Sequence, residues 1–298
     1  MVTETIRDEG TGRKFTLDRP AETPEGGLTF VLNLHGGGSV GPWQREYFPA
    51  YEHVDTHGLV VATPSAKTKE PFRIWVGEAD DEHLRSVVEH VFADLGTANI
   101  RSFWLAGHSQ GGMTSNRLLR TDYFADRVDG WLSLSGGRLG LAEHAPGFGP
   151  PPPPGQPPFQ PPENLVKLRR LESELPQADF SFIFAVGEHE IVALPETSPW
   201  AERYEAGARV QLPDVVDDQP GKIHDTLREG RSSPSWGLLP RPGVAQVFVY
   251  PDAAGGRVIA DVVRLDKGHT EGLEPNVTEA IVAMMVSAPG GKAQRASR

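Results

Sequence analysis

The chain of 298 residues contains no cysteine, and this absence excludes three kinds of chemistry. Disulfide bonds, a thiolate nucleophile and a cysteine-ligated zinc ion all require a side chain that the sequence lacks. A chain without cysteine fits a reducing compartment. We therefore expect a cytoplasmic protein.

Basic residues are outnumbered. The sequence carries 29 Lys and Arg against 40 Asp and Glu, a formal net charge of −11 at pH 7. Nucleic acids and anionic membranes repel such a charge, so we expect neither as a partner. The sequence leaves a homodimer open.

Long apolar runs are missing as well. No run approaches the ~20 residues that a membrane-spanning helix needs. Residues 1–10 are polar and acidic, without the basic start and apolar centre of a signal peptide. We expect no membrane association, while a truncated form of a secreted protein stays open.

The composition that is present, 38% hydrophobic, is enough for the core of one α/β domain over residues 1–286. Apolar runs of strand length alternate with segments of helical periodicity, which predicts a mostly parallel central sheet with helices on both faces. The predicted strands are 13–17, 28–34, 59–63, 101–106, 128–137, 180–187 and the hairpin 244–250 with 257–265. The predicted helices are 43–57, 80–95, 113–119, 165–175 and 276–286.

Three segments depart from this alternation. Residues 146–162 form a proline-rich insert, predicted to be an extended excursion that is either a flap beside the active site or a loop without a role. Residues 194–243 lack periodicity and are predicted to be an irregular, cap-like insertion with Trp200, Tyr204 and Trp236 as pocket walls. Residues 287–298 are predicted to be a disordered tail.

The chain is organised around Gly-His-Ser-Gln-Gly-Gly at residues 107–112, which contains a G-x-S-x-G pattern. A predicted strand precedes it and a predicted helix follows. In that setting the chain must reverse within a few residues, which strains the backbone of Ser109 and presents its hydroxyl at the edge of the sheet. The amide of Gln110 and the helix N-terminus then lie beneath any developing anion. This pattern predicts a nucleophilic serine.

A second glycine-rich turn follows the buried strand 28–34. His-Gly-Gly-Gly occupies residues 35–38. Such a turn frees backbone N–H groups to face a ligand, as an oxyanion hole opposite the nucleophile requires.

A nucleophilic serine needs an imidazole to take its proton and a carboxylate to orient that imidazole. Chains with this turn run serine, acid, histidine in order. The order favours His269, which follows the last strand, over His189 and His224. The favoured acid is Glu190, because it follows a strand-ending glycine; the alternative acids are Asp217, Asp218 and Asp225. The run Glu-His-Glu at 188–190 lacks partner ligands, so we expect no metal.

With these residues in view, the chain resembles the α/β-hydrolases of the polyhydroxybutyrate depolymerase and feruloyl or acetyl xylan esterase group. The matching features span residues 13 to about 286. They are Leu-His-Gly-Gly-Gly at 34–38, the acidic pair at 80–81, Gly-His-Ser-Gln-Gly-Gly-Met at 107–113, Phe-Ala at 124–125 and Gly-His-Thr at 268–270.

The resemblance implies the α/β-hydrolase fold and a Ser109, Glu190, His269 triad that hydrolyses carboxylic esters. It also implies that the amides of Gly37 and Gln110 form the oxyanion hole. Beside these motifs, Trp43, His108 and Gly38 are predicted to contact substrate. No cofactor is expected.

The predicted function is a serine esterase acting on a small-molecule or oligomeric ester. Glu-Gly at 271–272 replaces the family's Trp-Pro, and no polymer-binding module follows, which favours a soluble substrate over a solid polymer. Two alternatives stay open: an amide or polyamide hydrolase with the same triad, and a non-catalytic binding protein of the same fold.

Overall fold

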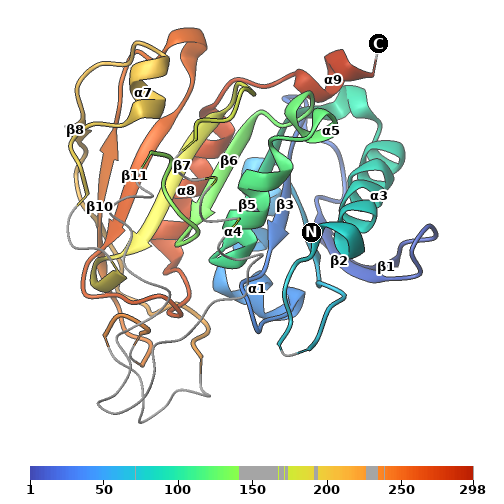
Figure 1. Cartoon of the computed structure of the whole chain (residues 1–298), viewed down its shortest axis with the longest axis horizontal. Coiled ribbons are helices and arrows are strands. Elements are labelled where there is room, and N and C mark those ends of the chain that lie inside the picture. The colour runs from blue at the N-terminus through green and yellow to red at the C-terminus, as the bar shows by residue number, and fades with distance from the viewer. Residues whose placement is uncertain are drawn as a thin grey trace.

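The structure, a computed structural model, describes residues 1–70, 72–140, 167, 171, 174–190, 194–225, 234–237 and 239–297. The proline-rich insert 146–162 and most of the predicted helix 165–175 lie outside the described residues. The molecule is built around one large twisted sheet (Figure 1).

Among the described residues, the sheet contains eleven strands in the order β1-β2-β4-β3-β5-β6-β7-β11-β10-β8, with β9 paired to β10. Their bounds are β1 Val2–Arg7, β2 Lys14–Arg19, β3 Leu28–Leu34, β4 Leu59–Pro64, β5 Ile100–His108, β6 Gly130–Leu134, β7 Ser181–Gly187, β8 Val210–Gln211, β9 Val215–Val216, β10 Val244–Val249 and β11 Ile259–Arg264. The six central strands from β4 to β11 run parallel, and the outer strands pair antiparallel. All residues of β3, β4, β6, β7 and β11 are buried, which explains their continuous apolar runs.

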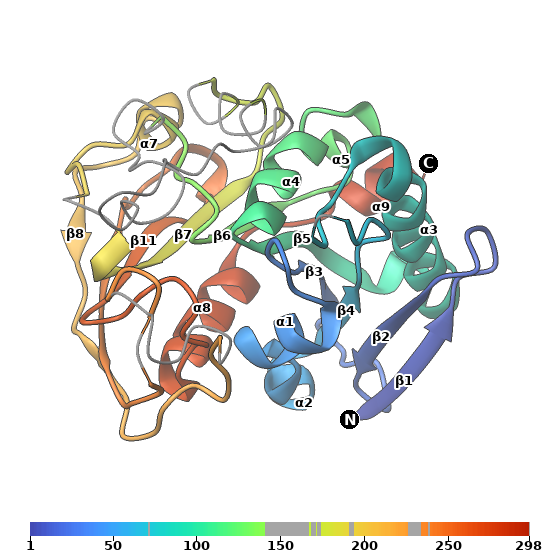
Figure 2. The ribbon, with the colours of Figure 1, turned by 60° about the horizontal axis from the view of Figure 1, so that its bottom comes forward.

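Helices cover both faces of the sheet. The α-helices are α1 Gly41–Tyr47, α2 Val54–His57, α3 Gly77–Leu95, α4 Gln110–Leu118, α5 Asp122–Ala125, α7 Pro199–Arg203, α8 Pro275–Ser287 and α9 Lys292–Ala296. Short 3-10 turns are η1 Ala50–His53, η2 Thr97–Asn99, η4 Glu188–Glu190 and η6 Ala254–Gly256. Figure 2 shows α1, α2 and α8 on one side of the sheet and α3, α4, α5 and α9 on the other.

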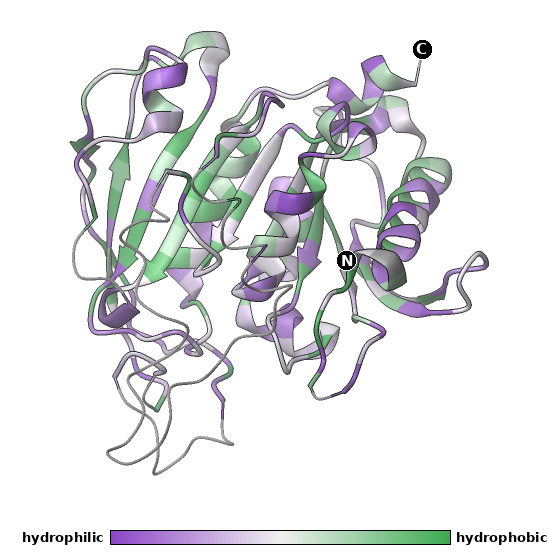
Figure 3. Cartoon of the chain, in the orientation of Figure 1, coloured by the Kyte–Doolittle hydropathy of each residue, from purple (hydrophilic) through white to green (hydrophobic). Residues whose placement is uncertain are grey.

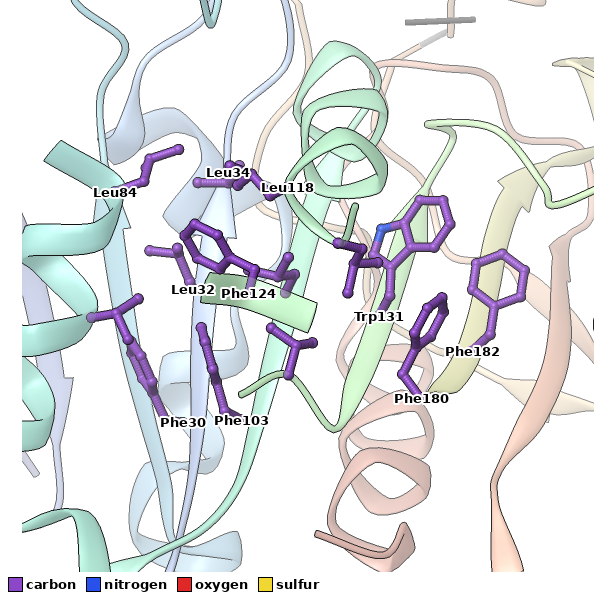
Figure 4. Packing of buried hydrophobic residues seen from close by; sticks show 14 of the residues in the cluster. Phe30, Leu32, Leu34, Leu84, Phe103, Leu118, Phe124, Trp131, Phe180 and Phe182 are labelled. Atoms are coloured by element: carbon purple, nitrogen blue, oxygen red, sulfur yellow. The ribbon is translucent and has the colours of Figure 1, made fainter. Parts of the chain in front are cut away.

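Each face of the sheet has its own hydrophobic core. One core joins the strands to α3, α5 and α9, and the other joins them to α1, α2 and α8. In the first, Trp131 packs on Phe182 with ring centroids 4.8 Å apart, and Phe30 stacks on Phe103 at 4.8 Å (Figure 4). Hydrophobic residues follow the strands, whereas the outer sides of α3 and α7 are hydrophilic (Figure 3).

The segment 194–243 differs from the expected irregular cap. Its described part contains α7, β8 and β9, and both strands extend the sheet by pairing with β10. Trp200 is fully buried and stacks on Phe180 at 4.3 Å, and Tyr204 packs on Trp200. These two aromatics therefore belong to the core and do not line a pocket, because Phe180, directly before β7, packs on Trp200, and Trp200 in turn packs on Tyr204.

The C-terminal segment is ordered where a disordered tail was predicted. Helix α9 packs on β5, with Ala293 buried. The Lys292 ammonium donates to the Ala125 carbonyl at 2.8 Å, and the Gln294 amide donates to the Ile100 carbonyl at 3.1 Å. One buried alanine and side chains bound to backbone carbonyls give no periodic apolar signal, so the sequence pattern did not reveal this helix.

The N-terminal residues also form more structure than predicted, since β1 pairs with β2 along its whole length. In the described part of the chain, no helix is both long and apolar enough to cross a bilayer. The parallel centre, the helices on both faces and the strand-turn-helix at residue 109 make this the α/β-hydrolase fold, as predicted.

Candidate active site

Ser109 joins β5 to α4 in a strained conformation, with φ 52° and ψ −120°. A non-glycine residue in such a region costs about 1–3 kcal/mol and persists only where its surroundings fix it. Here the Ser109 N–H donates to the carbonyl of Leu134, at the end of β6, at 2.8 Å. The structure therefore gives Ser109 the sharp turn that the sequence motif predicts.

Two glycines allow this turn to form. A Cβ atom at Gly107 would lie 2.4 Å from the carbonyl carbon of Gly111, and a Cβ at Gly111 would lie 2.4 Å from the carbonyl oxygen of Leu34 in β3. Any side chain at either position would meet backbone. Glycine at both positions brings α4 close to the carboxyl ends of β3 and β5.

His269 meets Glu190 at the same edge of the sheet. His269 lies on the loop after β11, and Glu190 ends the turn η4 that follows β7. The imidazole Nδ1 lies 2.5 Å from Glu190 Oε2, with the two side chains 17% and 11% exposed. When Nδ1–H donates to this carboxylate, Nε2 is left with a lone pair that can accept a proton.

The Glu190 carboxylate is fixed at its second oxygen too. Oε1 accepts a hydrogen bond from the Ser135 hydroxyl at 2.8 Å and another from the Gly187 N–H at 2.9 Å. Both oxygens therefore have donors, and the carboxyl plane cannot rotate without breaking one of them. Sequence reasoning missed Ser135; its only signal is the Ser-Gly-Gly that follows β6.

Residues 234–237 bind the His269 loop through backbone hydrogen bonds. The His269 N–H donates to the Ser235 carbonyl at 3.0 Å, and the Thr270 N–H donates to the Trp236 carbonyl at 2.9 Å. The Trp236 indole meets the imidazole edge to face, with ring centroids 5.1 Å apart and an interplanar angle of 90°. Of the three aromatics predicted to line the pocket from this segment, Trp236 is the one that lies beside the candidate base.

The His108 side chain contacts the His269 backbone and ring. It is 4% exposed, and its Nε2 donates to the His269 carbonyl at 2.8 Å. Its ring stands 4.7 Å from that of His269 and 4.1 Å from that of Tyr47. Burial, reinforced by the neighbouring His269, lowers the pKa of His108 well below its usual range. The predicted substrate contact of His108 is therefore wrong, because the ring is covered by these neighbours.

Tyr47, which sequence reasoning also missed, completes this support. Its hydroxyl donates to the His269 carbonyl at 3.2 Å, and its ring stacks on Trp43 at 5.0 Å. Trp43 itself is half-buried, so its exposed part can still reach a substrate. No sequence motif marks Tyr47, because its role depends on a contact 222 residues along the chain.

The Ser109 hydroxyl and His269 share this site without a direct bond. His108 precedes Ser109 and touches His269, so the two side chains are brought to one place. No hydrogen bond joins them in the described part of the chain. Catalytic hydrogen bonds are often long in ligand-free enzymes and tighten when substrate binds.

Two backbone amides at the site have no acceptor in the described part of the chain: those of Gly37 and Gln110. Gln110 is the first residue of α4, where helical N–H groups have no partner within the helix. Gly37 is exposed, and a Cβ there would lie 3.8 Å from Gln110 Cβ. The Gly38 N–H donates to the Arg73 carbonyl at 2.7 Å, so this predicted substrate residue has no amide to offer.

Buried hydrogen bonds fix the two segments that carry these amides. The His35 imidazole joins the glycine-rich turn to the segment after β4: Nδ1 donates to the Gly36 carbonyl at 2.7 Å and Nε2 accepts from the Ala66 N–H at 3.0 Å. Burial lowers the pKa of His35 to about 4, so the ring stays neutral at pH 7. The side-chain amide of Gln110 binds the backbone of Trp75: its Oε1 accepts from the Trp75 N–H at 3.1 Å, and its Nε2 donates to the Trp75 carbonyl at 3.0 Å.

The alternative side chains are used elsewhere. Asp217 caps α8 by accepting from the N–H groups of Asn276 and Val277 at 2.7 and 3.2 Å, and Asp218 is exposed. His189 pairs with Asp266 at 2.7 Å. Glu190 already accepts the imidazole hydrogen, so Asp225 is not needed for that role either.

The site can thus perform acid–base and nucleophilic chemistry with its own side chains. It brings together a strained serine, a histidine oriented by a carboxylate, and two unpaired amides. Within the described ranges, no three His, Asp or Glu side chains converge as a metal site.

Comparison with known proteins finds likeness only among solved structures. No family model and no curated protein matches the chain. Substrate-bound FphF of Staphylococcus aureus, a fluorophosphonate-binding serine hydrolase, is 14% identical over 63% of this chain and 79% of its own, with a TM-score of 0.39. Est1E of Butyrivibrio proteoclasticus with bound ferulic acid is 14% identical over 63% and 80%, with a TM-score of 0.38. An esterase of Thermogutta terrifontis, phosphonylated by sarin, is 13% identical over 62% and 72%, with a TM-score of 0.39.

Proposed function

We propose that the chain is a serine hydrolase that cleaves carboxylic esters through an acyl-enzyme on Ser109. The observation that carries this proposal is the 2.5 Å pairing of His269 Nδ1 with Glu190 at the edge of the sheet where Ser109 is strained. A carboxylate and an imidazole that are only 11% and 17% exposed, paired with each other beside a strained serine, serve no evident purpose in packing.

In the proposed reaction, His269 Nε2 takes the proton of Ser109 Oγ as the oxygen attacks the ester carbonyl carbon. The N–H groups of Gly37 and Gln110 donate to the oxyanion that forms. The tetrahedral intermediate expels the alcohol, which receives the proton from His269. Water then attacks the acyl carbonyl carbon and gives a proton to His269. The bond to Ser109 Oγ breaks, the carboxylic acid leaves, and Ser109 Oγ takes the proton back from His269, while Glu190 stays ionised throughout.

The first test compares hydrolysis of p-nitrophenyl acetate and butyrate by the wild type and Ser109→Ala. Because the triad acts as a unit, we expect kcat to fall on the order of 10⁶-fold in the variant. Intact mass after fluorophosphonate treatment should show one adduct on the wild type and none on the variant. Full activity in Ser109→Ala would overturn the proposal, and a wild type with neither turnover nor adduct would favour a binding protein.

The substrate class is proposed at the level of a small or oligomeric ester. The resemblance to polyhydroxybutyrate depolymerases and to feruloyl or acetyl xylan esterases supports an ester, and Glu-Gly at 271–272 favours a soluble one. An amidase would use the same nucleophile and oxyanion hole. Turnover of an aryl ester against its matching anilide separates the two, and faster anilide cleavage would contradict an esterase.

A further inference from the structure

A second strained serine lies beside the proposed triad. Ser135 has φ 52°, the same value as Ser109, and follows directly after β6. β6 lies between β5, which leads to Ser109, and β7, which leads to Glu190. Ser135 therefore stands at the strand end between the proposed nucleophile and the proposed acid.

Backbone hydrogen bonds join these strand ends in sequence. The Ser109 N–H donates to the carbonyl of Leu134, and the Ser135 N–H donates to the carbonyl of Ala185, both at 2.8 Å. The strands are in register, with His108 opposite Leu134 and Leu134 opposite Ala185. The Ser135 N–H thus extends the backbone hydrogen-bond ladder between β6 and β7 by one residue beyond the end of β6, and this fixes the position of the Ser135 side chain.

The side chain uses this placement to bind the acid. Ser135 Oγ donates to Glu190 Oε1 at 2.8 Å, whereas Oε2 of the same carboxylate meets His269. Without the hydroxyl, Oε1 would keep only the Gly187 N–H, and a carboxylate held by one donor on that side is free to turn. Any such turn moves Oε2 away from the imidazole.

We infer that Ser135 is a positioning residue, whose hydroxyl orients the Glu190 carboxylate so that Oε2 holds the His269 imidazole toward Ser109. This role rests on the proposed function for its effect on turnover. Glycine would relieve the strain at this position, but it would leave Oε1 without its side-chain donor. The strained backbone is therefore explained by the hydroxyl that it places.

The test replaces Ser135 by alanine, which has the same Cβ and thus the same backbone strain as serine but lacks the donor. The matched control is Ser133→Ala, in the same strand. Ser133 Oγ donates to the Gly137 carbonyl at 2.7 Å and has no hydrogen bond to the triad. A charge-assisted hydrogen bond is worth roughly a factor of 10 or more. We expect kcat of Ser135→Ala to fall on the order of 10-fold with KM unchanged, and kcat of Ser133→Ala to stay within about twofold of wild type.

A second readout does not depend on turnover. The proton between His269 Nδ1 and Glu190 should give a low-field resonance in proton NMR, assigned by its loss in His269→Gln. We expect it to weaken or broaden in Ser135→Ala and to persist in Ser133→Ala. An unchanged resonance in Ser135→Ala, or unchanged kcat, would overturn the inference. If the wild type hydrolyses no ester the proposed function fails, yet the resonance still tests the positioning of the pair.

Discussion

Glu190 has hydrogen-bond partners on both of its carboxylate oxygens. One oxygen accepts from Ser135 and Gly187, and the other meets His269. The carboxylate can only accept, so it fixes the imidazole with its hydrogen on Nδ1. An amide in its place could donate instead and would favour the opposite tautomer, which has no base at Nε2.

We therefore expect Glu190→Gln to lower kcat about 10² to 10⁴-fold while the protein stays folded. Steady-state kinetics with p-nitrophenyl butyrate and a urea denaturation curve measure the two effects. Asp217→Asn is the control, because Asp217 caps α8 and lies outside the proposed triad. Near-wild-type activity of Glu190→Gln would reassign the acid.

At the scale of elements, the position of Ser109 depends on how closely α4 approaches the strand ends. Gly111 touches the carbonyl oxygens of β3 and of His35, since an added Cβ would lie 2.4 and 2.6 Å from them. These obstacles are backbone atoms, which cannot swing aside as a side chain could. An added methyl group must push α4 away from the sheet.

Gly111→Ala should accordingly lower the free energy of unfolding by about 1–3 kcal/mol and reduce kcat, because the helix carries the Gln110 amide with it. Gly26→Ala makes a matched control, since a Cβ there meets no atom within 4 Å. Thermal unfolding and ester turnover of both variants measure the difference. Equal free energies of unfolding for Gly111→Ala and Gly26→Ala would mean that α4 and β3 are less tightly apposed than the contacts of Gly111 indicate.

For the whole molecule, buried neutral histidines link stability to pH. Burial lowers the pKa of His35 to about 4, and it also lowers the pKa values of His83 and His108. Below the unfolded pKa of about 6.5, the unfolded chain binds protons that the folded protein does not. The stability that these neutral imidazoles contribute is therefore fully present above about pH 6.5, and it is lost as the pH falls toward their pKa values in the folded protein.

From pH 7 to pH 5, His35 alone should remove about 2 kcal/mol from the free energy of unfolding, given its pKa of about 4. His83 and His108 act in the same direction. Urea denaturation at pH 7, 6 and 5 measures this loss. A free energy that stays constant over this range would show that the imidazoles are protonated in the folded protein.

The sequence was most informative where a local pattern carries the physics. Apolar runs mark strands buried on both faces, and glycines around Ser109 mark a turn that only glycine permits, so the fold class and the position of the strained serine could be predicted. His269 was selected as the candidate base by chain order. Helix α9 and strand β1 escaped, because their contacts are made by a few side chains and an alternating half-buried pattern.

What only the tertiary structure decided is which side chains meet. Glu190 reaches His269 across 79 residues, and Tyr47 reaches the same residue across 222. No local pattern encodes such distances, since they follow from the order in which strands join the sheet. For the same reason His108 proved to be buried support, Trp200 proved to be core, and Ser135 acquired a partner. The sequence by itself determined a strained serine at a strand end, and the sheet determined its neighbours.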